Sequence, residues 1–112
     1  MLILTYIHIK VIMSIIQPEI IEKSSEMLKA IAHPIRIMIL QNLYENQKLT
    51  VSQLIEKTGV EQSLISHNLR IMKDRGILNV TRQSKNAYYE LKFMKLYEIV
   101  ECVVECCRAD QR

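Results

Sequence analysis

The stretch from Gln62 to Asn86 constrains the fold of this chain more than any other part of the sequence. It reads QSLISHNLRIMKDRGILNVTRQSKN. If a helix begins at Gln62, the 3.6-residue period places an apolar stripe and a polar, basic stripe on opposite sides of it. A glycine, a short apolar run and a basic turn come next. The stretch therefore predicts a helix that packs on a core through one side and is followed by a β-hairpin.

The polar stripe of this helix has the chemistry that DNA recognition needs. It carries Ser63, Ser66, His67, Arg70 and Asp74, whereas the apolar stripe carries Ile65, Leu69 and Met72. Hydroxyl and guanidinium groups can read base edges and phosphates in the major groove. Residues 62–86 contain five cations against one acid, an excess of four charges that exceeds the +3 of the whole chain. A solvated surface helix can carry similar charges, so the flanking elements decide between the two interpretations.

The flanking elements favour DNA binding, because they complete a helix-turn-helix with a wing. Pro18 and Pro34 suit the first turns of helices, Thr50 or Ser52 can cap the next one, and Gly59 can end it. We expect helices over residues 18–32, 34–45, 51–58, 62–75 and 92–108, and strands over residues 77–82 and 87–91. The predicted fold is mainly α with a small β-hairpin: a winged helix-turn-helix of about five helices with a two-stranded wing.

The first and last of these helices carry apolar stripes that suit a second subunit. In the last helix the stripe recurs at steps of three and four residues, a spacing that is typical of helix pairing. In the first helix Ile20, Ile21, Leu28 and Ile31 are expected to point inward, and the first three also form a companion surface. The predicted homodimer interface comprises Ile20, Leu28, Phe93, Leu96, Val100, Val103 and Cys107.

Length and cysteine usage exclude several classes of protein. A chain of 112 residues suits one domain. Its three cysteines, Cys102, Cys106 and Cys107, lie within six residues, which gives neither a disulfide framework nor a CxxC zinc motif and favours a reducing cytoplasm. The sequence has no glycine-rich phosphate loop, no catalytic Ser/His/Asp order and no closed set of metal ligands. We therefore predict neither an enzyme nor a cofactor or resident metal.

Residues 1–16 form an apolar extension, MLILTYIHIKVIMSII, in which only Lys10 is charged. The extension lacks the basic start and cleavage site of a signal peptide, and it is shorter than the roughly 18–20 residues that span a bilayer. We therefore predict no membrane partner. Partial alternation from Ile3 to Val11 favours a strand, and a buried helix is an alternative. A third reading starts the protein at Met13. If residues 1–12 are made, their apolar surface must pack on the body or on a second subunit.

Three motifs together resemble the ArsR/SmtB family of winged-helix transcriptional repressors over roughly residues 20–100. LKAIAHPIRIMILQNL resembles the family's helix pair around Ala-x-x-x-Pro-x-Arg, and VEQSLISHNLRIMKDRGIL resembles its recognition helix, with Asn68 in place of the usual histidine. NAYYEL resembles the outgoing wing strand. His33 fits the family's helix junction. The resemblance implies a bacterial homodimer that binds operator DNA and, in many members, releases it when a metal or oxidant binds.

With this resemblance, residues 17–108 are expected to form the DNA-binding and dimerisation domain, with residues 109–112 as a tail. Two recognition helices in a dimer suit an inverted-repeat operator. The helix should present Gln62, Ser63, Ser66, His67 and Arg70 to the groove. Lys73 and the wing residues Arg82 and Lys85 should meet the DNA backbone.

The family's signal-sensing residues do not match this chain. Thr50-Val51-Ser52 stands where thiolate sensors have Cys-Val-Cys, the last helix has no histidine, and the second helix has no cysteine to pair with one on the last. Two interpretations of Cys102, Cys106 and Cys107 stay open. They are a redox or soft-metal sensor, or, as we favour, small apolar packing residues. A winged-helix module that binds protein rather than DNA is the other alternative.

Overall fold

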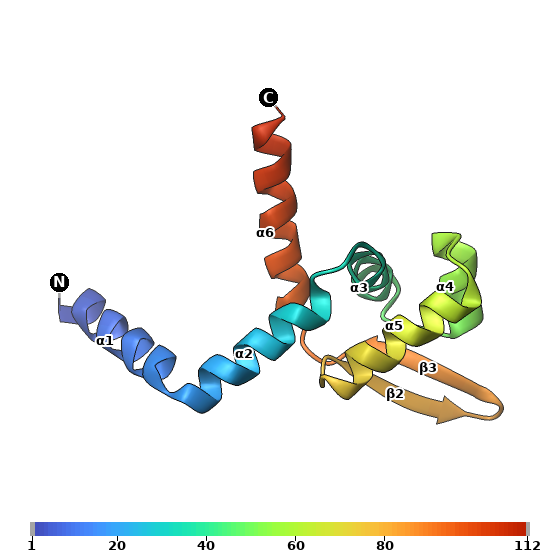
Figure 1. Cartoon of the computed structure of the whole chain (residues 1–112), viewed down its shortest axis with the longest axis horizontal. Coiled ribbons are helices and arrows are strands. Elements are labelled where there is room, and N and C mark those ends of the chain that lie inside the picture. Colours follow the sequence, from blue (N-terminus) through green and yellow to red (C-terminus); the bar gives the residue numbers. More distant parts are fainter. Residues whose placement is uncertain (1, 112) are drawn as a thin grey trace.

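The computed structural model describes residues 2–111 and contains a winged helix body from which helices project (Figure 1). The elements in chain order are α1 (Leu2–Ile16), α2 (Pro18–Ile31), α3 (Pro34–Asn46), β1 (Lys48–Leu49), α4 (Val51–Thr58), α5 (Gln62–Asp74), β2 (Leu78–Gln83), β3 (Asn86–Leu91) and α6 (Lys95–Asp110). The three strands form an antiparallel sheet in the order β1-β3-β2. The predicted fold class is confirmed, with one helix and one short strand added to it.

Two prolines and a histidine set the junctions of the helices that precede the sheet. Pro18 and Pro34 occupy the first positions of α2 and α3, where the missing N–H is no loss because that N–H has no helical partner. The backbone N–H of Ile35 donates to Nδ1 of His33 at 3.2 Å. His33 therefore caps α3, which agrees with its expected place at the helix junction.

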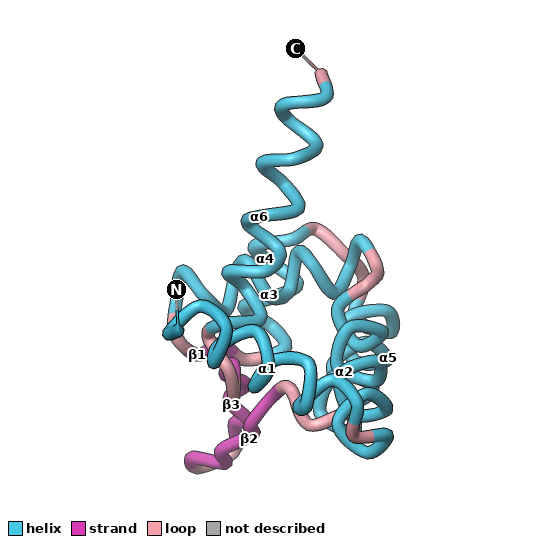
Figure 2. The backbone as a smooth tube through the Cα atoms, turned by 90° about the vertical axis from the view of Figure 1, so that its left-hand side faces the viewer, coloured by secondary structure: helices cyan, strands magenta, loops and turns pink. Residues whose placement is uncertain are grey.

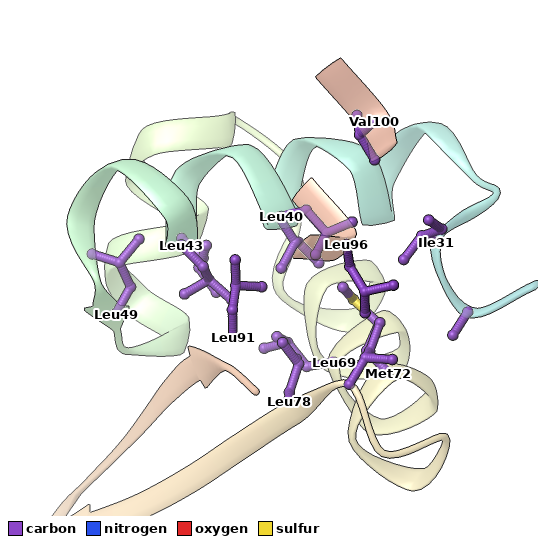
Figure 3. Close-up of a cluster of buried hydrophobic side chains, with 14 of the residues drawn as sticks. Ile31, Leu40, Leu43, Leu49, Leu69, Met72, Leu78, Leu91, Leu96 and Val100 are labelled. Atoms are coloured by element: carbon purple, nitrogen blue, oxygen red, sulfur yellow. The ribbon is translucent and has the colours of Figure 1, made fainter. Parts of the chain in front are cut away.

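One hydrophobic core holds α3, α4, α5, the sheet and the first half of α6 together (Figure 3). The largest fully buried side chains in it are Ile39, Leu40, Leu43, Leu54, Ile65, Leu69, Met72 and Ile77. Truncating one such side chain to alanine costs about 2–5 kcal/mol in typical proteins. This core fixes the apolar side of α5, so the opposite side of the helix is held outward.

Helix α1 corrects the strand interpretation of the N-terminal extension. Residues 2–16 are helical, and residues 2–12 are exposed, so the alternative of a buried helix is also wrong for the single chain. A helix forms its hydrogen bonds within itself, whereas a strand needs a neighbour along its edge. Among the described residues α1 packs mainly on the next helix, α2, and it extends away from the body of the molecule (Figure 1). No helix among the described residues is long and apolar enough to cross a membrane.

Helix α2 corrects the expectation that its first turns point inward. Ile20, Ile21 and Leu28 are 43%, 48% and 51% exposed, and only Ala30 and Ile31 near its end are buried in the core. The helix leaves the body as an arm, as Figure 1 shows. Its apolar side therefore lies open along an apolar groove that Ile20, Ile21, Ser24, Ser25 and Leu28 line.

Helix α6 begins three residues later than expected and continues into the predicted tail, since it runs to Asp110. Leu96 and Val100 are buried in the chain's own core, at 6% and 7% exposure, whereas Val103 is 56% exposed. The prediction that the whole apolar stripe of the last helix contacts a second subunit is thus corrected: the first half of α6 packs on α3, and the second half projects from the body (Figure 2). Residue 112 of the predicted tail lies outside the described residues.

A tyrosine pair anchors α6 to α3. The rings of Tyr44 and Tyr97 stack with centroids 4.0 Å apart and planes inclined by 17°. Burial, then the carboxylates of Glu101 and Glu45, raise the pKa of Tyr97 above its usual 10.0. Because the pKa is higher in the folded state, the neutral phenol contributes to the stability of the folded chain below pH 10. This stabilisation is lost as the pH rises through the raised pKa.

Candidate nucleic-acid interface

Helices α4 and α5 form the two-helix unit that presents the candidate interface. A capping box starts α4: the backbone N–H of Gln53 donates to Thr50 Oγ1 at 3.2 Å, and the N–H of Thr50 donates to Gln53 Oε1 at 2.8 Å. Gly59 ends α4 with φ of +72°, a conformation that costs glycine little. Three residues later α5 begins, so the turn between the two helices is tight.

The two sides of α5 divide as the helical period predicts. Ile65, Asn68, Leu69 and Met72 are buried. On the opposite side the structure brings together the predicted DNA-contacting residues of the helix. Of these, Ser66 is half-buried, and the exposed ones are Gln62, Ser63, His67, Arg70 and Lys73. This side offers donors and acceptors of several kinds along one continuous surface.

The wing carries the other two predicted contacts. Strands β2 and β3 pair from Leu78↔Leu91 to Gln83↔Asn86, and a two-residue turn at Ser84 and Lys85 joins them. Ser84 has φ of +57°, as tight hairpin turns require at such a position. Arg82 and Lys85 are exposed at this tip, and Figure 1 shows the hairpin extending beyond the body of the molecule. Both cations are therefore available to an anionic partner.

One acidic side chain modifies the start of α5. Glu61 precedes the helix, and Ser63 Oγ donates to Glu61 Oε1 at 2.9 Å. The carboxylate is favourable at a helix N-terminus, yet it would repel a nearby phosphate. To bind DNA, Ser63 must give up this hydrogen bond. Within the described part of the chain, no comparable side-chain bond occupies the predicted DNA-contacting residues further along α5.

The sequence did not predict a role for two residues that the structure joins, Arg36 and the buried side chain of Asn68. Arg36 Nε donates to Asn68 Oδ1 at 3.0 Å, and Asn68 Nδ2 donates to the Leu64 carbonyl at 2.8 Å. The sequence could have indicated Asn68, because this polar residue occupies a position at which the helical period of α5 places apolar residues. Such a residue needs a partner when buried, although the sequence does not say which.

The predicted subunit-contact residues fall into two groups. Ile20, Leu28, Phe93 and Val103 are large apolar side chains with substantial exposure, and Cys107 is also exposed. Leu96 and Val100 belong to the core of the single chain, as described above, because the first turns of α6 lie against α3. Exposed apolar side chains therefore lie both on α2 and on the second half of α6.

The cysteines lie on the projecting half of α6. Cys102, Cys106 and Cys107 are free thiols and exposed in the single chain, so they are not packing residues of its core. Cys102 and Cys106 are four residues apart and share a side of the helix. Within the part of the chain that the structure describes, no three His, Cys, Asp or Glu side chains gather closely enough to hold a metal ion.

Comparisons with known proteins agree with this geometry. A model of the family "Bacterial regulatory protein, arsR family" matches residues 33–80. The chain is 34% identical over 84 residues to the uncharacterised HTH-type transcriptional regulator MJ1325 of Methanocaldococcus jannaschii, which covers 75% of this chain and 94% of that protein. It is 33% identical over 81 residues to the transcriptional repressor PagR of Bacillus anthracis, over 72% of this chain and 81% of PagR.

Solved structures give the same result. The crystal structure of PagR superposes with a TM-score of 0.68 at 32% identity, covering 74% of this chain and 94% of PagR. A solution structure of Mb0332 from Mycobacterium bovis, described as a homodimeric winged helix-turn-helix DNA-binding domain, superposes with a TM-score of 0.70, over 78% of this chain and 82% of that one. At 23% identity the second likeness concerns the fold alone.

Proposed function

The chain belongs to the ArsR family of bacterial regulatory proteins, and from that premise we propose that it is a homodimeric repressor that binds an inverted-repeat operator through α5 and the wing. Its named relatives are regulators of transcription, not enzymes. One observation carries the proposal: the polar, basic side of α5 is exposed while the core holds the opposite side. The protein is expected to act in the cytoplasm, where operator DNA is found.

The proposed DNA contacts divide by chemistry. The exposed side of α5, with Gln62, Ser66, His67 and Arg70, enters the major groove and reads base edges. Ser63 joins this set after releasing Glu61. Lys73 on α5 and the wing cations Arg82 and Lys85 neutralise phosphates, which supplies affinity without sequence preference.

The area of exposed surface supports a dimer. The chain exposes 8529 Å², whereas a compact monomer of 13.2 kDa exposes about 6,400 Å². Two chains therefore carry an excess of roughly 4,200 Å² together, which falls in the range that obligate dimers bury. Large apolar side chains on α1, α2 and α6, including Ile20, Leu28 and Val103, are exposed in the single chain and suit such a contact. We propose that α2 and the second half of α6 form the main subunit contact and that α1 adds to it.

The experiment uses a fluorescent duplex that the wild-type protein selects from a random-sequence library. Fluorescence anisotropy at several salt concentrations gives the affinity and its salt dependence. We expect Lys85→Ala to weaken binding to all duplexes alike and to lower the salt slope by about one unit, since one phosphate contact is lost. Lys95→Ala removes an exposed cation from the first turn of α6, outside α5, the wing and the proposed subunit contact, and should change neither quantity.

The same experiment tests the protein-interaction alternative. If the library yields no preferred duplex, and if Lys85→Ala binds random DNA as tightly as the wild type does, α5 and the wing are not a DNA-binding surface. That result would favour a winged-helix adaptor that binds another protein.

A further inference from the structure

A buried amide in α5 has both of its polar groups occupied. Asn68 is only 3% exposed. Its Nδ2 donates to the Leu64 carbonyl one turn earlier in α5, at 2.8 Å, which fixes the orientation of the side chain. Its Oδ1 then accepts from Arg36 Nε of α3 at 3.0 Å. A charged donor makes this the stronger kind of hydrogen bond, and burial increases the cost of leaving it unmade.

The same arginine holds the end of α2. Arg36 Nη1 donates to the Lys29 carbonyl at 2.9 Å. That carbonyl lies in the last turn of α2, where carbonyl groups lack a partner within the helix. Because the guanidinium is planar and rigid, the positions of Nε and Nη1 relative to each other are fixed. The guanidinium therefore sets the end of α2 and the middle of α5 at a defined separation.

A second polar contact between the two helices is weaker. Arg75, at the end of α5, lies 3.6 Å from Glu26 of α2, between Nη1 and Oε2, and the Glu26 side chain is 50% exposed. Arg75 Nη1 is buried and has no hydrogen-bond partner among the described residues, and its 3.6 Å distance to a half-exposed carboxylate is an ion pair without a hydrogen bond, so it restricts the relative orientation of the two helices less. Arg36 of α3, which donates to both the Lys29 carbonyl of α2 and Asn68 of α5, thus links these two helices through hydrogen bonds.

We infer that Arg36 and Asn68 are positioning residues that align the recognition helix α5 with α2 and thereby determine operator specificity. The inference rests on the proposed function, in which α2 carries the subunit contact and α5 reads the bases. Base-edge contacts need α5 at a defined depth and angle in both half-sites. Phosphate contacts from long wing cations tolerate small displacements, since they depend on charge more than on geometry. Loss of the link should therefore reduce specific binding and spare non-specific binding.

The test compares the wild type with Asn68→Leu, which keeps similar volume and removes both hydrogen bonds of the amide. Each protein is titrated against the duplex that the wild type selects and against a shuffled duplex of the same length and composition. We expect Asn68→Leu to lose about tenfold or more in affinity for the selected duplex. Its affinity for the shuffled duplex and its salt slope should match those of the wild type.

Matched variants separate positioning from stability. Asn42→Ala removes a half-buried amide whose bond, at 2.8 Å to the Met38 carbonyl, stays within α3, so it should not change the ratio of the two affinities. Asn68→His retains one ring acceptor and one ring N–H and should restore much of the ratio. If Asn68→Leu folds poorly, Arg36→Met combined with Asn68→Leu replaces the polar pair by an apolar one, and the ratio is measured on that protein.

Three results would overturn the inference. One is an unchanged affinity ratio in a folded Asn68→Leu or paired variant, and another is an equal loss on both duplexes. A wild type that binds the selected and shuffled duplexes equally would refute the proposed function itself, and this inference with it. Only the first two results leave the proposed function standing, so the two failures can be told apart.

Discussion

At the scale of single residues, Arg70 is the strongest candidate for reading a base. It is exposed on the polar side of α5, and a guanidinium can donate to both guanine O6 and N7. We expect Arg70→Ala to cost about 1–3 kcal/mol of operator binding and to relax the preference at one base pair. Titrations against duplexes that each carry one changed base pair measure both effects. A uniform loss over all duplexes would instead assign Arg70 to a phosphate, and no loss would exclude it from the interface.

The three cysteines are the only thiols available for a chemical signal. They lie on the half of α6 that is proposed to meet a second subunit, so their modification could alter the spacing of the recognition helices. Release from DNA requires that the signal bind the free and DNA-bound states with different affinity. We expect the variant with serine at positions 102, 106 and 107 to leave DNA under oxidant or soft metal as the wild type does. Loss of that response in the serine variant would identify the thiols as the sensor and contradict the interpretation that the cysteines are only packing residues.

Single residues also mark the limit of sequence analysis. The period of α5 correctly divided Leu69 from Arg70, because a helix in contact with a core must bury one side. The role of Asn68 could not be predicted, because its partner Arg36 is 32 residues away. Its burial was detectable in principle, since the residue occupies the apolar stripe.

At the scale of elements, the capping box of α4 is the local feature that starts the helix-turn-helix. Thr50 accepts from Gln53 N–H, and the bond replaces one that the first turn of a helix lacks. We expect Thr50→Ala to lower the free energy of unfolding by about 0.5–2 kcal/mol. Urea denaturation measures the change, and Ser52→Ala, an exposed hydroxyl within the first turn, is the control. Equal stability of both variants would show that the cap contributes nothing.

Each element that was predicted correctly has residues within or beside it that indicate its type or its ends. Prolines, Gly59 and the capping residues mark the ends of helices, and alternation marks the wing strands. Strand β1 has no such signal, since two residues make a strand only by pairing with β3, at Lys48↔Glu90 and Leu49↔Tyr89. For α1 the residue types led to the wrong prediction, a strand. Its β-branched residues suit a strand, but a strand needs a neighbouring edge.

At the scale of the whole molecule, the shape of the single chain argues for a partner. Its radius of gyration is 16.8 Å, whereas a compact chain of 112 residues has about 13 Å. We expect Ile20→Glu combined with Val103→Glu to give a monomer, because charges would be buried at the contact without partners. Ile20→Val combined with Val103→Ile keeps the apolar surface and should stay dimeric. Sedimentation velocity measures both, and a dimer of the charged variant would move the contact elsewhere.

Two copies of this chain are proposed to bind one operator together. Sedimentation velocity of the wild-type protein with its selected, labelled duplex measures the number of chains on each DNA molecule. Two chains should bind each duplex in one cooperative step, with half-sites about one helical turn, roughly 34 Å, apart. A folded monomer that binds the duplex singly at micromolar concentration would contradict the account, as would a duplex that needs only one half-site for full affinity.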